Sequence, residues 1–283
     1  MKEDVQEGNE TTGNFPGRPI ALTIAGFDPS GGAGVTADLK VFAAHHIYGM
    51  ACITALTIQS TMGVRRVEHV SGGTIRETLA CLREDVGPAG VKIGMLGTAE
   101  AVGEIAGFLS EAGIDRKKII LDPIIHSSSG RELLTPDGLA RLKSELLPQV
   151  GWVTPNLDEL AALTGTGSAS RESIPEATAS LQGKNPSLGI IVTGGHLDRP
   201  DDFLLLPDGT GHWLEGKRVE TRSTHGTGCA FSSALLSRLI LGDNPEKAAA
   251  GAKEYVTAAL KAAYPVGQGR GPMHHLFGID SSL

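Results

Sequence analysis

Short apolar segments alternate with longer segments of helical period along most of this 283-residue chain. Runs of this length that are rich in Ile, Val and Leu are typical of strands buried on both faces of a parallel sheet. We expect strands at 20–25, 51–57, 91–95, 119–122, 151–154 and 189–193. The alternation predicts an α/β fold with a doubly wound, mostly parallel sheet that is flanked by helices on both faces.

The segments between these runs have the period of amphipathic helices. We expect helices at 33–45, 73–85, 98–112, 136–147, 156–164, 172–183, 226–240 and 245–263. The stretch 202–222 differs, because two apolar segments flank a Pro-Asp-Gly-Thr-Gly turn at 207–211, which predicts an antiparallel hairpin at the sheet edge. Residues 1–18 are polar and are expected to form a flexible arm, with one domain over 19–283.

The composition argues against several classes of protein. The chain has 25 Lys and Arg against 32 Asp and Glu, a net charge of −7, and no basic stripe, so nucleic acid is not an expected partner. No apolar run reaches the length that crosses a bilayer, so no membrane partner is expected. The three cysteines lie far apart without metal-ligand spacing, which fits a reducing, cytoplasmic location. Small molecules are therefore the expected ligands.

A glycine-rich turn at 25–38 connects the first expected strand to the first helix. Residues 32–37 match G-x-G-x-x-A, which also occurs in dinucleotide-binding proteins. Such sites need an acidic residue near the end of the second strand, and here none follows that strand before Glu68, so a dinucleotide oxidoreductase is a poor fit. The glycines could instead form only a tight turn. Asp38, on the following helix, could face either the strand ends or solvent.

The second segment with chemical potential is 223–234, where Gly226 and Gly228 open a long helix. Unpaired backbone N–H groups and the positive end of the helix dipole make such a start a seat for phosphate. A cysteine at this place, Cys229, is expected to have a lowered pKa and could act as a base. Alternatively, Cys229 is a small packed side chain beneath the turn.

The third segment is Thr154-Pro155-Asn156-Leu157-Asp158-Glu159-Leu160, where an expected strand leads into a helix. Asn156 is a good N-cap, and Glu159 three residues later completes the pattern of a capping box. The same two side chains could organise a metal ion and its waters at nucleotide phosphates. Both roles are compatible, because a cap at a strand's carboxyl end already faces the crevice of the sheet.

Together these segments closely resemble the hydroxymethylpyrimidine and phosphomethylpyrimidine kinases of the ribokinase-like superfamily. The resemblance runs from Ala21 to Phe277. It is carried by ALTIAGFDPSGGAGVTADLK at 21–40, TALTIQST at 54–61, KIGMLG at 92–97, LDPIIHSSSG at 121–130, TPNLDEL at 154–160, TGGH at 193–196, THGTGC at 224–229 and GQGRGPMHH at 267–275. It implies a homodimer that uses ATP and Mg²⁺ to phosphorylate 4-amino-5-hydroxymethyl-2-methylpyrimidine, its monophosphate, or both, in thiamine biosynthesis.

The resemblance also implies roles for individual residues. Asp38 and Gln59 would hydrogen-bond the aminopyrimidine, in a pocket shaped by Gly26, Ala33, Thr57 and Met95. Gly226, Thr227, Gly228 and Cys229 would form an anion hole around the transferred phosphoryl group. Asn156, Glu159, Thr193 and His225 would contact the nucleotide, with Asp122 and Glu159 at the metal ion.

The chain departs from the family pattern at two cationic positions. Thr193 and Ser128 stand where relatives usually carry lysine. Both changes remove positive charge from a site whose chemistry depends on electrostatic stabilisation of phosphate. His126, Arg131, His225, Arg270 or Mg²⁺ could replace that charge. Two alternatives to the pyrimidine kinase remain: a pyridoxal or pyridoxine kinase, and a pyrimidine-binding homologue without catalysis.

Overall fold

One sheet forms the centre of the molecule in the computed structural model, which describes residues 17–127, 130–167, 170–195 and 197–280. Its strands are β1 Ile20–Phe27, β2 Tyr48–Ser60, β3 Gly63–His69, β4 Gly90–Ile93, β5 Ile119–Leu121, β6 Trp152–Val153, β7 Gly189–Val192, β8 Asp202–Leu205 and β9 Gly211–Leu214. The nine strands lie in the order β3-β2-β1-β4-β5-β6-β7-β8-β9, and those from β2 across to β7 run parallel. The predicted doubly wound, mostly parallel sheet is confirmed.

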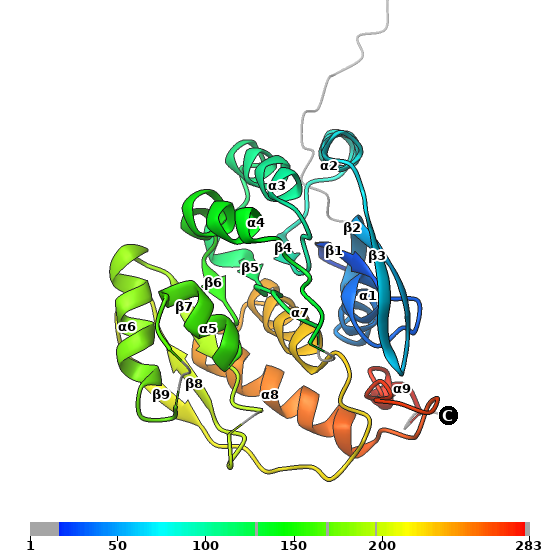
Figure 1. Ribbon diagram of the computed structural model, residues 1–283, viewed down its shortest axis with the longest axis vertical. Coiled ribbons are helices and arrows are strands. Elements are labelled where there is room, and N and C mark those ends of the chain that lie inside the picture. The colour runs from blue at the N-terminus through cyan, green and yellow to red at the C-terminus, as the bar shows by residue number, and fades with distance from the viewer. Residues whose placement is uncertain (1–16, 128–129, 168–169, 196, 281–283) are drawn as a thin grey trace, which may run out of the picture.

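Helices cover both faces of this sheet (Figure 1). One face is covered by α2 Gly72–Asp85, α3 Ala99–Glu111, α4 Pro136–Arg141, α5 Leu157–Thr164 and α6 Ile174–Lys184, and the other by α1 Gly34–Ala44, α7 Thr227–Ile240 and α8 Pro245–Lys261. Three short helical turns, η1 Arg116–Lys118, η2 Leu142–Leu146 and η3 Leu147–Gln149, and the last helix, α9 Phe277–Asp280, complete the elements.

Consecutive residues of a strand point to opposite faces of the sheet, so their side chains pack into the two different hydrophobic cores, one on each face. Ile120 packs into the core beneath α7 and α8, whereas its neighbour Leu121 packs into the core beneath α3. Ile190 and Ile191 divide in the same way. This double burial explains why these strands appear in the sequence as continuous apolar runs without alternation.

Antiparallel strands close both edges of the sheet. The predicted hairpin is confirmed as β8 and β9, in which Phe203 pairs with Trp213. At the other edge β3 pairs antiparallel with β2, and this strand was missed from the sequence. Its residues, GVRRVEH, are half-buried or exposed, so they lack the apolar run by which a strand is identified.

A helix was predicted over 136–147, but the regular α-helix is shorter than predicted and ends at Arg141. α4 stops at Arg141 and continues as η2 and η3, and Pro148 lies within the last turn. Pro148 has no backbone N–H to donate, so the last turn cannot form a regular α-helical hydrogen bond at that residue. Among the residues that the structure describes, every helix is too short or too polar to span a bilayer.

The topology creates a crevice beside β1. The chain places β2 on one side of β1 and β4 on the other, so the order of strands reverses there. Connections that leave two adjacent strands in opposite directions open a gap at their carboxyl ends, which is where open α/β sheets bind ligands. The loops that begin α1 and α7 lie side by side at this edge, since His225 next to α7 approaches Gly32 next to α1.

Candidate active site

A cavity of about 1440 Å³ opens at the carboxyl ends of the strands. It is lined by every predicted site residue except Asp38: Gly26, Ala33, Thr57, Gln59, Met95, Asp122, Asn156, Glu159, Thr193, His225, Gly226, Thr227, Gly228 and Cys229. These residues come from segments far apart in the sequence, so the fold alone assembles them. The cavity is large enough for both a nucleotide and a small acceptor.

A recess of the cavity is lined by Gly26 of β1, Thr57 and Gln59 of β2, and Met95 just after β4. A Cβ atom at Gly26 would lie 2.8 Å from Met95 Sδ, so a larger residue there would displace the Met95 side chain that lines the recess. The Thr57 hydroxyl donates a hydrogen bond to the Phe27 carbonyl at 3.0 Å, which ties the two strand ends together. Gln59 projects its amide from β2 toward His225.

The other side of the recess is the start of α7. Gly226 precedes this helix with φ +81°, and no side chain of the described residues caps the helix at that point. The first N–H groups of α7 therefore have no side-chain acceptor, although most other long helices here have one, such as Ser71 for α2 and Thr98 for α3. An uncapped helix start that faces a cavity is a seat for an anion.

A buried ionic cluster lies directly beneath this helix start. Asp38 is fully buried and accepts hydrogen bonds from Lys92 Nζ at 2.9 and 3.1 Å, Thr23 Oγ1 at 2.6 Å and Ser233 Oγ at 2.8 Å. Lys92 Nζ also lies 4.0 Å from Asp122 Oδ2. Asp38 thus turns toward the strand ends, not to solvent. It lies outside the cavity wall, so a direct hydrogen bond to a pyrimidine is not the role that this geometry favours.

The electrostatics of the cluster follow from its burial. Burial works to lower the pKa of the Lys92 ammonium, but Asp38, Cys229 and Asp122 outweigh it and raise that pKa. Lys92 is therefore charged and neutralises Asp38 within the protein.

Cys229 behaves differently from the expectation based on its place in the helix. The thiol is 5% exposed, and burial raises its pKa to about 12 even though Lys92 lies nearby. The expected lowered pKa is wrong, because removal from water outweighs the helix dipole and the Lys92 charge. In the ligand-free protein the Cys229 side chain is a protonated thiol at neutral pH.

Two buried acids line the cavity between β5 and α5. Asp122 and Glu159 are 4% and 6% exposed. Burial raises the pKa of Asp122 to about 6, and burial together with the Asp122 charge raises the pKa of Glu159 to about 8. Asn156 and Glu159 form the predicted capping box, with Asn156 Oδ1 accepting from the Glu159 N–H at 2.9 Å and Glu159 Oε2 accepting from the Asn156 N–H at 2.8 Å.

The donor set at these acids fits a divalent cation held partly by a ligand. The buried Thr154 Oγ1 has no hydrogen-bond partner among the described residues, and Thr154 lines the cavity with Asp122 and Glu159. A cation would favour the ionised form of both carboxyl groups. No group of three or more His, Cys, Asp and Glu gathers for a metal within the described ranges, so phosphate oxygens and waters would have to complete the coordination.

Positive charge around the cavity differs from what we expected. Thr193 lines the cavity, whereas Ser128 lies outside the described residues. Three of the side chains expected to replace the missing positive charge, His126, His225 and Arg270, also line the cavity. The His225 ring, however, is hydrogen-bonded to the Asp28 carboxylate. Four further cations line the cavity and were not identified from the sequence: Lys217, Arg218 and Arg222, in a segment without regular structure, and Lys253 of α8, which is paired with Asp202.

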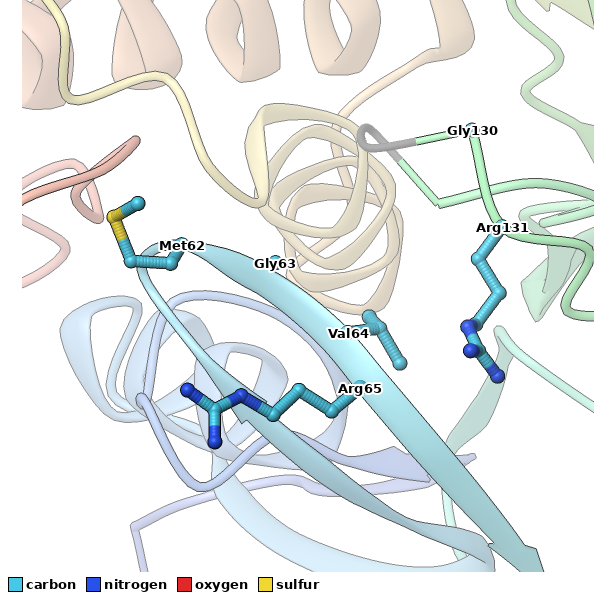
Figure 2. A pocket seen from close by; sticks show the side chains of 6 residues that line it. All are labelled: Met62, Gly63, Val64, Arg65, Gly130 and Arg131. Atoms are coloured by element: carbon cyan, nitrogen blue, oxygen red, sulfur yellow. The ribbon is translucent and has the colours of Figure 1, made fainter.

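Arg131 lies at a smaller side opening of the same cleft. This pocket of about 380 Å³ is lined by Met62, Gly63, Val64, Arg65, Gly130 and Arg131, and several of these residues also line the main cavity. Figure 2 shows the Arg131 side chain extending beside Val64, while Arg65 lies on the other side of β3. Arg131 therefore lines the side of the cleft next to the β2–β3 hairpin.

Besides Lys217, Arg218, Arg222 and Lys253, three residues of the site were missed from the sequence: Asp28, Lys92 and Thr154. Lys92 had a usable signal, because a lone lysine within the apolar strand VKIGM must be paired if it is buried. Asp28 also had one, since an aspartate that opens a glycine-rich turn commonly accepts hydrogen bonds from the turn's N–H groups. Thr154 had none, because an unpartnered hydroxyl is visible only in three dimensions.

The parallel sheet, the uncapped helix start and the acid pair at one cavity define a ribokinase-like phosphotransferase. Solved structures agree with this class. The crystal structure of an ADP complex of Bacillus subtilis pyridoxal kinase matches with a TM-score of 0.83 and 32% identity, covering 91% of this chain and 97% of that one. Phosphomethylpyrimidine kinase from Clostridium difficile 630 matches with a TM-score of 0.76 and 34% identity, covering 86% of this chain and 100% of that one.

The chain belongs to the phosphomethylpyrimidine kinase family, whose model matches residues 28–274. The hydroxymethylpyrimidine/phosphomethylpyrimidine kinase of Rhizobium meliloti (strain 1021) is 42% identical over 259 residues. That match covers 90% of this chain and 96% of the relative.

Proposed function

We propose that this kinase transfers the γ-phosphoryl group of ATP to 4-amino-5-hydroxymethyl-2-methylpyrimidine and to its monophosphate, in thiamine biosynthesis. One observation carries the proposal: the recess formed by Gly26, Met95 and Gln59 and the uncapped start of α7 face the same cavity. An acceptor in the recess would present its hydroxymethyl group to the helix start, where the transferred phosphoryl group would be stabilised.

The nucleotide would lie along the neighbouring part of the cavity. Apolar side chains of α8, Val256 and Leu260, line this part with Val219, and they suit the face of an adenine ring. Lys217 and Arg222 are placed to supply positive charge for the phosphates in this chain, where Thr193 carries none. Asn156 and Thr193 would contact the phosphates through their polar side chains.

Mg²⁺ is expected at Asp122 and Glu159, whose carboxylates would hold it, and when bound it would supply positive charge for the nucleotide phosphates. Glu159→Gln keeps the capping box, since glutamine also accepts from the Asn156 N–H, but it removes a ligand charge. We expect the Mg²⁺ concentration for half-maximal thermal protection by ADP to rise about tenfold or more. Glu176→Gln, on the exposed surface of α6, is the matched control and should leave it unchanged. An unchanged Mg²⁺ requirement in Glu159→Gln would contradict this assignment.

Cys229 has a defined part in the reaction with the alcohol. The Cys229 thiol is already protonated, so it can accept the proton of the alcohol only if it gives the thiol proton to another group. The Asp122 carboxylate, which accepts a hydrogen bond from the Cys229 thiol, is that group. The monophosphate, whose second pKa is about 6, is mostly dianionic near neutral pH and needs no base. We expect Cys229→Ala to slow phosphorylation of the alcohol by about 10²-fold and of the monophosphate by less than about tenfold, in single-turnover measurements. Equal losses would leave Cys229 a purely structural part of the anion hole.

The proposed quaternary structure is a homodimer located in the cytoplasm. Exposed apolar residues concentrate on β2 and its turn, with Tyr48 at 58%, Leu56 at 47%, Ile58 at 39% and Met62 at 67% exposure. Exposed apolar side chains next to the edge strand β3 suit contact with a second copy of the same chain. Light scattering at micromolar concentration should give twice the mass of the chain, and a monomer would contradict the dimer.

A pyridoxal kinase is the second candidate, because the B. subtilis pyridoxal kinase has a closely similar fold. Both acceptors are heteroaromatic rings with a hydroxymethyl group, so the recess could accommodate either. Direct comparison of turnover on pyridoxal and on the pyrimidine distinguishes the two candidates. Binding of the pyrimidine without ADP production would identify the third, a homologue without catalysis.

A further inference from the structure

The Asp28 carboxylate organises the loop that begins α1. It accepts hydrogen bonds from Ser30 N–H at 2.8 Å, Ser30 Oγ at 2.7 Å, Gly32 N–H at 3.2 Å and Ala33 N–H at 2.9 Å. A fifth donor comes from the distant turn before α7, since His225 Nε2 lies 2.8 Å from Asp28 Oδ2. One buried carboxylate therefore holds together the loop of residues 28–33, called here the acceptor loop, and the turn of residues 224–226, called here the phosphoryl-binding turn.

The two loops also fit together without spare room. A Cβ atom at Gly32 would lie 2.4 Å from His225 Cδ2, and a Cβ at Gly226 would lie 1.8 Å from the Gly32 carbonyl oxygen. The His225 backbone N–H donates to the Gly271 carbonyl at 3.1 Å. His225 is thus the point at which three segments of the chain meet beside the cavity.

Gln59 is a second partner of the same imidazole, after Asp28. Its amide nitrogen lies 3.0 Å from His225 Nε2. Burial alone would raise the pKa of the Asp28 carboxyl, but hydrogen bonds from His225 and Ser30 outweigh it and leave that pKa below its ordinary value. Asp28 is therefore ionised at neutral pH, and the proton of their hydrogen bond lies on His225 Nε2.

A protonated Nε2 determines which way the Gln59 amide points. Two donors would oppose each other if the NH₂ group faced His225, and the assignment of amide oxygen and nitrogen follows from such networks. The Gln59 carbonyl oxygen therefore faces His225 and its NH₂ group faces the cavity. A donor in this position matches the lone pair of a ring nitrogen in the acceptor, not the acceptor's amino group.

We propose that His225 is a positioning residue, which through Asp28 locks the acceptor loop to the phosphoryl-binding turn and directs the Gln59 NH₂ group at the acceptor ring. This role differs from the nucleotide contact expected from the sequence. It rests on the kinase activity proposed above, so wild-type turnover on the pyrimidine is measured first. Absent wild-type turnover counts against the proposed function, and the variants below then test His225 through pyrimidine binding alone.

The variants His225→Ala and His225→Gln separate positioning from bulk structure. Glutamine places an N–H donor near the position of Nε2, so it can still bond Asp28. We expect His225→Ala to lower kcat/KM for the pyrimidine by about 10²-fold, with KM for ATP changed less than about threefold, and His225→Gln to recover at least about tenfold of that loss. His212→Ala, an exposed histidine on β9, is the control and should match the wild type.

Two further variants complete the test. Asp28→Ala combined with His225→Ala should be little worse than Asp28→Ala alone, because Asp28→Ala already removes the link to His225 together with the bonds to Ser30, Gly32 and Ala33. Gln59→Glu keeps an acceptor for His225 but loses the donor, so calorimetry should show at least about tenfold weaker pyrimidine binding. The proposal is overturned if the double variant is additive, if His225→Gln is as impaired as His225→Ala, or if Gln59→Glu binds the pyrimidine normally.

Discussion

Gly226→Ala is expected to lower kcat by about 10²-fold or more. Gly226 has φ +81°, and a Cβ atom there would lie 1.8 Å from the Gly32 carbonyl oxygen, a backbone atom that cannot move alone. The first turn of α7 must therefore shift away from the acceptor loop. Loss of one aligned N–H donor to a developing anion costs about 10²- to 10³-fold in kcat. Steady-state kinetics with the pyrimidine and ATP would measure the effect.

Gly209→Ala is the matched control for this prediction. Gly209 has φ +87° in the turn between β8 and β9, and the nearest atom to its added Cβ would be Gln182 Oε1 at 3.8 Å. The substitution thus has the same backbone penalty, about 1 kcal/mol, without the clash. It should lower the melting temperature slightly and leave kcat unchanged. If Gly226→Ala retained kcat within a few-fold of wild type, the helix start would not be the seat of the transferred group.

Lys92→Met is expected to destabilise the protein by about 3–5 kcal/mol. The change leaves the fully buried Asp38 carboxylate without its countercharge, and removal of one partner of a buried ion pair costs about this much. Hydrogen bonds from Thr23 and Ser233 remain, but neither carries a charge. Urea unfolding followed by circular dichroism would give the free energy of unfolding.

Two companion variants make the Lys92 result specific. Lys117→Met changes an exposed lysine in η1 and should alter the free energy of unfolding by less than about 0.5 kcal/mol. Lys92→Met combined with Asp38→Asn removes the uncompensated charge and should recover more than half of the lost stability. A loss below about 1 kcal/mol in Lys92→Met alone would show that Asp38 does not depend on this lysine.

Features set by local patterns could be predicted from the sequence. The helix that starts near Gly226, the β8–β9 hairpin and the Asn156–Glu159 capping box each depend on a few neighbouring residues, and the structure confirms them. Apolar runs likewise indicated the buried strands. β3 was missed because an edge strand with one partner can form from polar residues.

Features set by distant contacts could not be predicted in the same way. The direction of Asp38 depends on Lys92, which lies 54 positions later, and the protonation of Cys229 depends on how deeply α7 is buried. The pairing of Asp28 with His225 spans 197 positions. Helix position alone suggested a reactive thiol, but burial, which is a property of the whole fold, outweighs it.

This kinase should phosphorylate both the hydroxymethylpyrimidine and its monophosphate. The most direct test is ATP-dependent ADP release with Mg²⁺, measured in parallel for 4-amino-5-hydroxymethyl-2-methylpyrimidine, its monophosphate and pyridoxal. We expect turnover on both pyrimidines well above that on pyridoxal, which would also show that Thr193 and Ser128 are compatible with activity. Pyridoxal turnover exceeding that on both pyrimidines, or pyrimidine binding without ADP release, would contradict this expectation.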